Sequence, residues 1–259
     1  LSLLQAAQQK GQLSAASLAN AGDWLRSGAL PSEAVASLRD LCDRGAWAEL
    51  EDRFYKGIAF GTGGMRGRTV GRVSAANELA ADGTPVRAAV GSACLNDVNV
   101  LRAALGLWRH VSAAHPSPRI VIAHDVRHFS RHFAELVASA WSRLGGEAYL
   151  FAGARSTPQL SFTVRHLGAH AGVVITASHN PSHDNGFKCC LGHGGQVTPP
   201  DDAAIVAEVG KLGPADVAPY LEKDLGGVRT VDAAAEEAYL ARVAGIVLPG
   251  VLLGMRGQI

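Results

Sequence analysis

Three short apolar segments alternate with two amphipathic ones in the middle of the chain, and this alternation constrains the fold more than any other feature. The amphipathic segments, residues 130–144 and 157–167, place apolar side chains at the spacing of one buried helix face. Strands separated by such helices pair in parallel through right-handed crossovers. The sequence therefore predicts a β-α-β-α-β unit within a three-layer α/β sandwich. The predicted strands are residues 119–124, 147–153 and 171–177.

The loops that follow these strands are the expected place for chemistry. In an open α/β sheet, ligands bind beyond the carboxyl ends of the parallel strands. The loop after the third strand, "SHNPSHDNG" (178–186), begins with Ser178 and His179 directly after an apolar run. In the loop after the first strand, Asp125 and Arg127 are predicted to form a pair that braces that loop. We therefore take the Ser178 loop as the candidate site.

Ser178 is compatible with three roles, namely a turn or cap residue, a nucleophile, or a carrier of a phosphoryl group. The G-x-S-x-G elbow of the α/β-hydrolases is absent, because Ala177 and His179 flank the serine. Adjacent side chains of an extended backbone point apart, which argues against a simple proton relay between Ser178 and His179. A phosphoserine would add about −1.5 to −2 charges and would need cationic or metal partners.

Two cations are candidates for that partnership. Asn185 and Gly186 form a hairpin-type turn signal, and a strand that runs back from such a turn would bring Lys188 towards Ser178. Arg66 lies in the glycine-dense, basic segment "GIAFGTGGMRGRTVGR", which predicts a loop. Glycines let backbone N–H groups approach an anion closely. That segment is neither a dinucleotide fingerprint nor a Walker A loop, because the required glycine and Gly-Lys-Ser/Thr are missing.

The histidines and cysteines do not form a recognisable metal or disulfide pattern. His124, His128 and His132 recur at every fourth position, but the first ends a predicted strand and the last lies in a predicted helix, so they share no face. Cys189 and Cys190 are adjacent and would form a strained disulfide. The chain contains no C-x-x-C spacing. We expect buried, reduced thiols of a cytosolic protein, with Cys189 and Cys190 in the core.

Charge and hydropathy exclude several classes of partner. The formal net charge is +1, so neither nucleic acid nor an anionic membrane surface is expected to bind. No apolar run reaches the roughly 18 residues of a membrane-spanning helix, and the first residues lack the pattern of a signal peptide. We expect a cytoplasmic protein. Because the chain starts with Leu1 rather than Met, we also expect a processed chain or a part of a longer one.

Two motifs together resemble one known family. The segment "TASHNPSHDNGFK" (176–188) resembles the phosphoserine loop of the α-D-phosphohexomutases, the phosphoglucomutase/phosphomannomutase superfamily. The segment "FGTGGMRG" (60–67) resembles the opening motif of its phosphoglucomutase/phosphomannomutase/phosphopentomutase branch. Further segments are similar to the first domain of that family and follow in the same order, and the resemblance runs from Gly57 to Val209. They are "VIAHDVRHFSRHFAE", "STPQLSFTVRHLGAHAGVVITASHNP" and "GGQVTPPDD".

The resemblance implies a fold and a domain plan. Residues 57–209 would form domain I, a three-layer α/β/α sandwich with a mixed, mostly parallel sheet, preceded by a helical N-terminal extension (1–56). Residues 210–259 would form a helical linker to a second domain. The family's D-G-D-x-D-R metal loop, G-E-x-S-G-H sugar loop and R-x-S-G-T phosphate loop belong to later domains and do not occur here. We expect a fragment that lacks domains II–IV and shows no mutase turnover alone.

The resemblance also implies a reaction. Ser178 would carry a phosphoryl group that interconverts a sugar 1-phosphate and a sugar 6-phosphate through a 1,6-bisphosphate. Mg²⁺ would bind the phosphate on Ser178 and take its other ligands from the second domain, with glucose 1,6-bisphosphate or an equivalent as activator. His179, Lys188 and Arg66 would stabilise charge or transfer protons. The implied substrate- and phosphate-binding residues are Thr62, Gly63, Asn180 and Asn185.

Three alternatives stay open beside this interpretation. The chain could belong to a phosphopentomutase of the same branch, since glucose, mannose and pentose phosphates are distinguished in later domains of the family. It could instead be a non-catalytic module that binds a sugar phosphate or a partner protein through the same loop. A serine hydrolase is the weakest of the three, because neither an elbow nor a triad is visible in the sequence.

Overall fold

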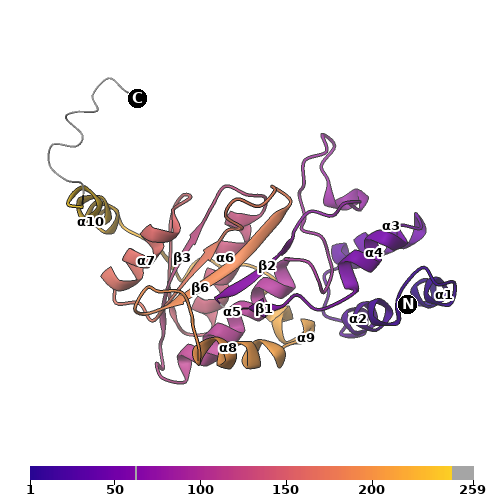
Figure 1. The fold of residues 1–259 in the computed structure, drawn as a ribbon, viewed down its shortest axis with the longest axis horizontal. Helices are drawn as coiled ribbons and strands as arrows, with labels where there is room; N and C mark the ends of the chain where they lie inside the picture. The colour runs from indigo at the N-terminus through magenta and orange to yellow at the C-terminus, as the bar shows by residue number, and fades with distance from the viewer. Residues whose placement is uncertain (62, 247–259) are drawn as a thin grey trace.

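A seven-stranded mixed sheet forms the centre of the molecule (Figure 1) in the computed structural model, which describes residues 1–61 and 63–246. The strand order is β1-β2-β6-β5-β3-β4-β7. The strands are β1 Phe60–Gly61, β2 Gly64–Arg68, β3 Arg119–His124, β4 Glu147–Leu150, β5 Ala171–Ile175, β6 Asp184–Leu191 and β7 Val228–Thr230.

The β-α-β-α-β unit predicted from the sequence is confirmed. Strand β3 pairs in parallel with both β4 and β5, and the intervening helices lie where the apolar spacing placed them. Parallel pairing brings the carboxyl ends of β3, β4 and β5 to one edge of the sheet. The loops that begin at Asp125, Phe151 and Thr176 therefore leave the sheet at that edge.

Helices cover both faces of this sheet. Helices α5, α6 and α8 pack on one face and share a core with Ile120, Ile122 and Phe187. Helix α7 and the start of α10 pack on the other face over Val121 and Val174. The chain thus forms the predicted three layers. The helices are α1 Ser2–Gln9, α2 Ala15–Arg26, α3 Ser32–Asp43, α4 Trp47–Phe54, α5 Asp97–Ser112, α6 Ser130–Arg143, α7 Thr157–His166, α8 Asp201–Gly210, α9 Pro214–Val217 and α10 Ala233–Ala244, with 3-10 turns at Ala76–Glu78 and Ala218–Tyr220.

The glycine-dense segment 57–72 is not the loop that its composition predicted. It contains β1 and β2, and β2 pairs antiparallel with β6 in the register Arg66 to Gly186. Gly64 explains how the strand fits, because a Cβ at that position would overlap the carbonyl oxygen of Phe187. The glycines here allow close backbone approach within a sheet, and they conceal a strand from composition-based prediction.

Helices α1–α4 occupy most of residues 2–54 and lie to one side of the sheet (Figure 1). They are not a separate body, because their core residues Trp24, Leu41 and Phe54 belong to one cluster with Leu101 of α5 and Leu136 of α6. Gly45, with φ +65°, lies between the end of α3 and the start of α4. The boundaries at residues 56/57 and 209/210 stay predictions.

A buried ionic network joins α4 to the segment that follows β2. The Arg53 guanidinium donates to Glu49 Oε1 at 2.7 Å and to the two carboxylate oxygens of Glu78 at 2.6 and 2.9 Å. All three side chains are at most 2% exposed. The two carboxylates also accept the backbone N–H groups of Val73 and Ala75. One guanidinium thus serves two carboxylates, and the backbone N–H groups help to stabilise the remaining negative charge.

The segment after residue 210 differs from the predicted helical linker. It contains the short strand β7, which pairs in parallel with β4 and covers the outer edge of the sheet. Three residues are too few to show the alternation by which a strand is recognised in a sequence. The last part of the predicted linker, residues 247–259, lies outside the described residues. In the part of the chain that the structure describes, we find no helix with the length and hydropathy needed to cross a membrane.

Candidate functional site

Ser178 stands just past the carboxyl end of β5 in an uncommon backbone conformation. Its φ is +57°, in the left-handed region that non-glycine residues rarely adopt. The Ser178 N–H donates to Oγ1 of Thr176 at 3.0 Å, and the side chain of Ser178 is exposed. Such a conformation costs roughly 1–3 kcal/mol and persists where the surrounding structure enforces it. Phe129, in the loop after β3, is the other non-glycine residue with positive φ among those described.

The left-handed backbone corrects the expectation that the Ser178 and His179 side chains point apart. That expectation assumed an extended backbone. In the structure, Oγ of Ser178 lies 3.4 Å from Nδ1 of His179. The distance is at the outer limit of a hydrogen bond, so the ring is close enough to exchange a proton with the hydroxyl after a small movement.

Arg127 holds the backbone of the Ser178 loop. Its guanidinium donates to the carbonyl oxygens of Ser178 and Asn180 at 2.6 Å each, of Pro181 at 2.7 Å and of Asp184 at 3.1 Å. Four carbonyl dipoles of one loop thus converge on one cation. This arrangement provides a physical reason for the strained conformation of Ser178, since the loop must curl to present these carbonyl groups together.

The predicted pair of Asp125 and Arg127 is confirmed, with Nε of the arginine 3.2 Å from the carboxylate. Asp125 also accepts a hydrogen bond from Oγ of Ser130 at 2.6 Å, which anchors the pair to the start of α6. From the sequence, Arg127 was expected to brace only its own loop, and its role in the Ser178 loop was missed. The one available signal was its position directly after a parallel strand, next to a carboxylate.

Arg66 and Asn180 are 114 residues apart in the sequence and form a hydrogen bond. Nη1 of Arg66 donates to Oδ1 of Asn180 at 2.9 Å, and the Asn180 amide donates in turn to Asp184 at 3.0 Å. The antiparallel pairing of β2 with β6 makes this hydrogen bond possible, because it places Arg66 opposite Gly186, at the edge of the sheet where the Ser178 loop begins. Two of the predicted site residues are therefore in direct contact.

Lys188 lies on the strand that runs back beside β5. It is on β6, opposite Val174 of β5 and Gly64 of β2, and it is half-buried. No hydrogen bond or ion pair joins it to Ser178 or to any other residue in ranges 1–61 and 63–246. The strand that runs back through Lys188 is confirmed, and the lysine brings an unpaired positive charge to the same sheet.

Asn185 is the clearest correction among the predicted phosphate-binding residues. It is 0% exposed, and its amide donates to the carbonyl of His128 at 3.0 Å and to Oγ of Ser130 at 2.8 Å. Its Oδ1 accepts the N–H of Gly186. Asn185 and Gly186 lie inside β6 rather than in a turn, because pairing with Gly67 and Arg66 of β2 overrides the local turn preference. Asn185 joins two loops and cannot reach a ligand.

The remaining predicted phosphate-binding residues are Thr62 and Gly63. Thr62 lies outside the described residues. Gly63 is buried, with φ +77°, and its carbonyl accepts the N–H of Cys189 at 3.0 Å. A Cβ on Gly63 would overlap the side chain of Gln196. The structure thus places Gly63 in the turn that starts β2, covered by a side chain.

The three regularly spaced histidines serve different elements. His124 is buried at the end of β3, and the ring of His132 lies 2.9 Å from Asp97 of α5. Among the residues that the structure describes, no group of three or more His, Cys, Asp or Glu side chains is arranged to hold a metal ion. Asp184 is the one carboxylate in the Ser178 loop (178–186), and it accepts a hydrogen bond from the Asn180 amide.

All four cysteines are buried and free, as expected from the sequence. Burial raises the pKa of Cys94 and Cys189 to about 12 and that of Cys190 to about 11. It also raises the pKa of Cys42. These thiols are placed as core residues rather than nucleophiles.

We expect the folded chain to resist alkylation. At about pH 8, a thiol with a pKa near 12 is ionised to only about one part in ten thousand, and the thiolate is the reactive form. Iodoacetamide should label Cys94 and Cys189 far more slowly in native protein than in guanidinium chloride, as followed by peptide mass spectrometry. Rapid native labelling of Cys189 would contradict its place in β6.

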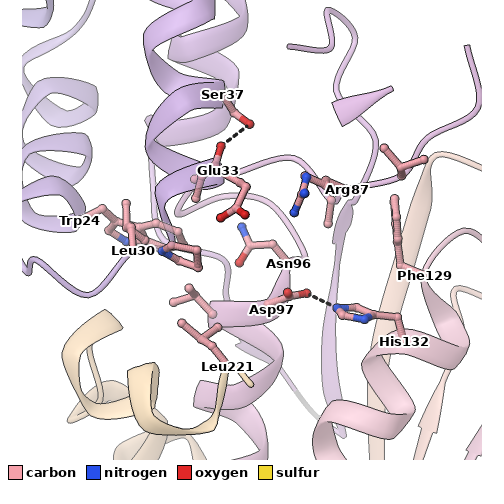
Figure 2. Close-up of a pocket in the computed structure, with 16 residues that line it drawn as sticks. Trp24, Leu30, Glu33, Ser37, Arg87, Asn96, Asp97, Phe129, His132 and Leu221 are labelled. Carbon is pink, nitrogen blue, oxygen red and sulfur yellow. Dashed lines mark hydrogen bonds and ion pairs between the residues drawn. The ribbon is translucent and has the colours of Figure 1, made fainter. Parts of the chain in front are cut away.

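A cavity of about 260 Å³ lies away from the Ser178 loop, between the N-terminal helices and the starts of α5 and α6. Figure 2 shows Trp24 and Leu30 across from Phe129, with the pair of Asp97 and His132 beside them. None of the predicted site residues lines this cavity. The chemistry that the sequence indicated is therefore at the carboxyl edge of the sheet and not in this cavity.

The site as a whole combines an exposed serine hydroxyl, a histidine ring beside it, and an arginine that binds Asn180 of the same loop. Such a group can bind and transfer a small anionic group, because the hydroxyl is accessible and Arg66 is not neutralised by a carboxylate. The oxygen of Ser178 faces solvent. A second molecule can therefore approach it without rearrangement of the core.

Comparison with known proteins gives a consistent result. A family model described as "Phosphoglucomutase/phosphomannomutase, alpha/beta/alpha domain I" matches residues 81–215. A phosphoglucomutase from Staphylococcus epidermidis (strain ATCC 12228 / FDA PCI 1200) is 33% identical over 176 residues, which are 68% of this chain and 29% of that protein. A phosphoglucomutase from Staphylococcus haemolyticus (strain JCSC1435) is 30% identical over 200 residues, 76% of this chain and 33% of that protein.

A solved structure supports the same fold. The crystal structure of a protein from Thermus thermophilus, described as a phosphomannomutase, aligns with a TM-score of 0.54 and 28% identity over 74% of this chain and 37% of that chain. This chain spans a third or less of the two curated relatives named above. The family model starts after Arg66, so the glycine-rich segment is placed in the site by its geometry.

Proposed function

Because the chain belongs to the phosphoglucomutase/phosphomannomutase family, we propose that Ser178 carries the phosphoryl group in the interconversion of a sugar 1-phosphate and a sugar 6-phosphate. The observation that carries the proposal is the position of Ser178, exposed and left-handed beyond a buried parallel strand, with four neighbouring carbonyl groups held by Arg127. A strained, exposed residue at a ligand-binding edge is what a preorganised nucleophile requires.

The proposed step is a phosphoryl transfer in both directions. In the forward direction, the bond between phosphorus and Ser178 Oγ breaks and a bond from phosphorus to a sugar hydroxyl oxygen forms. The sugar hydroxyl loses a proton, and Ser178 Oγ gains one. His179 is close enough to deliver a proton to Oγ, and Arg66, which is bound to Asn180 of the same loop, would stabilise charge on the transferred group. The bisphosphate so formed returns its other phosphate to Ser178 by the reverse step.

The wider reaction includes components that this chain does not supply by itself. We propose glucose 1,6-bisphosphate or an equivalent as the source of the phosphoryl group, and a Mg²⁺-dependent enzyme as the whole. The metal ligands other than the phosphate on Ser178 would come from outside the described residues. We likewise propose that the chain alone lacks mutase turnover, and robust conversion of glucose 1-phosphate would contradict this.

Phosphorylation of Ser178 tests the proposal directly. We expect Ser178 to gain one phosphoryl group, as seen by intact-mass and peptide mass spectrometry, when the whole enzyme that contains this chain and the proposed metal ligands is incubated with glucose 1,6-bisphosphate and Mg²⁺. The Ser178→Ala variant should gain none, because no other loop hydroxyl has the same placement. Ser182→Ala, in the same exposed loop, is the matched control and should label like the parent chain.

Each other outcome favours a different function. An unlabelled Ser178 together with retained binding of glucose 1-phosphate would favour the non-catalytic binding module. Label on Ser182 in place of Ser178 would refute the assignment of the carrier. Reaction of Ser178 with a fluorophosphonate, without phosphoryl labelling, would favour a hydrolase.

A further inference from the structure

A second cavity, of about 270 Å³, lies beside the Ser178 loop at the edge of the sheet. Its walls come from β2, from the residues that follow α4, and from the segment before α5. Of the candidate-site residues described above, Arg66 alone lines it. The cavity is therefore a neighbour of the phosphoserine site and not the same place.

The charged side chains of this cavity are mostly cationic. Lys56, Arg66, Arg68 and Arg72 contribute four positive charges, and Asp52 contributes the single carboxylate. Arg66 and Arg68 are two positions apart on β2, so their side chains leave the same face of the strand. The sequence as a whole has a net charge of only +1, which makes this a local concentration of positive charge.

These charges are poorly neutralised within the described residues. Arg66 donates to the neutral side chain of Asn180, and Arg68 donates to the backbone carbonyl of Val70 at 3.3 Å. The single ion pair, between Arg72 and Asp52, is loose at 3.6 Å, and the arginine is 68% exposed. Lys56 lies over the ring of Tyr55, which leaves its charge available.

We propose that this cavity is an anion site that binds the phosphate group of a small molecule, either inorganic phosphate or a phosphate ester. Arginines in pairs suit a phosphate dianion because their planar donors bind two oxygens at once. A concave site with several cations of one sign also focuses the electric field and raises the local anion concentration. The volume holds a phosphate group together with a few further atoms.

Arg66 lines this cavity and also binds the Ser178 loop, so an anion bound in the cavity should affect the reaction at Ser178. An anion in this cavity competes with Asn180 for the Arg66 guanidinium, and Asn180 belongs to the Ser178 loop. Occupancy should therefore slow phosphoryl labelling of Ser178. This consequence rests on the function proposed above, whereas the binding itself does not.

Binding can be measured in a Ser178→Ala background, where no phosphoserine forms. The amide signals of the labelled chain would be followed by NMR during titration with inorganic phosphate, and separately with glucose 6-phosphate, at constant ionic strength. We expect saturable shifts at Gly67, Ala93 and Cys94, which line the cavity. Arg68→Gln and Lys56→Gln should each weaken binding about tenfold or more, because each removes a charged donor.

A matched control and three outcomes make the test decisive. Arg229→Gln removes the same charge from β7, at the opposite edge of the sheet, and should leave binding unchanged. Tighter binding of either probe supports the site and identifies the source of the phosphate group. Equal binding by Arg68→Gln and the parent would overturn the proposal. If Arg66→Gln were the only variant to weaken binding, the anion would sit at the Ser178 loop, and the proposal would also be overturned. The proposal would also be overturned if the amide signals shifted with the chloride concentration rather than with the phosphate concentration.

Discussion

Replacing Arg53 by methionine should lower the free energy of unfolding by about 3–5 kcal/mol, the usual cost of removing one partner from a buried ion pair. The variant would leave the carboxylates of Glu49 and Glu78 buried and without their cation. Methionine fills much of the volume, so the loss reports on charge rather than on a cavity. Urea denaturation at neutral pH, with far-UV circular dichroism as the signal, measures the difference.

Two further variants separate this effect from a general loss of ion pairs. Arg44→Met removes the exposed pair with Asp40 and should cost at most about 1 kcal/mol. The triple variant Arg53→Met, Glu49→Gln, Glu78→Gln should recover part of the loss, because glutamine still accepts the backbone N–H groups without a buried charge. A change below about 1 kcal/mol for Arg53→Met would show that the network does not contribute as argued.

Replacing Arg127 by methionine should open the Ser178 loop. The variant removes a charged donor from four carbonyl groups of one loop. Hydrogen bonds to charged groups each contribute about 1.5–3 kcal/mol, so the loss of even two of the four should make local opening at least about a hundredfold more frequent. Amide hydrogen exchange at Asn180 and Asp184, whose N–H groups bond within the loop, measures this opening.

The same variant should lose most of the phosphoryl label at Ser178, because the strained conformation is no longer held. Arg131→Met is the matched control one turn along, since Arg131 binds Glu135 and the carbonyl of Ala152 instead of this loop. Arg127→Lys should fall between the two, because a lysine keeps the charge but cannot bind as many carbonyl groups. If amide hydrogen exchange at Asn180 and Asp184 were unchanged in Arg127→Met, the Ser178 loop would keep its conformation without Arg127, which would contradict the prediction.

The sequence predicted the local parts of this fold well. Apolar spacing in residues 130–144 identified α6, and the uninterrupted apolar run at 171–177 identified β5, because periodicity reflects which face of an element is buried. The prediction was wrong for the glycine-dense segment, where β2 forms only by pairing with β6, a strand more than a hundred residues away. Local composition carries no information about such a partner.

The candidate site shows the same limit at the scale of single residues. The position of Ser178 followed from the end of β5, but its positive φ did not, because the sequence does not show the carbonyl groups that Arg127 gathers. Asn185 was assigned to ligand binding from its place in a motif, whereas its burial depends on contacts with His128 and Ser130. Roles set by tertiary contacts are those that the sequence alone did not reveal.

The contact between Arg66 and Asn180, 114 residues apart, also bears on the order in which the chain folds. The unit from β3 to β5 closes through short connections, whereas β2 must wait for β6 to be present before it can join the sheet. Closing long loops is entropically costly and slow compared with local pairing. The unit from β3 to β5 would therefore be ordered before Arg66 reaches the Ser178 loop, and the contact between Arg66 and Asn180 would be among the last to form.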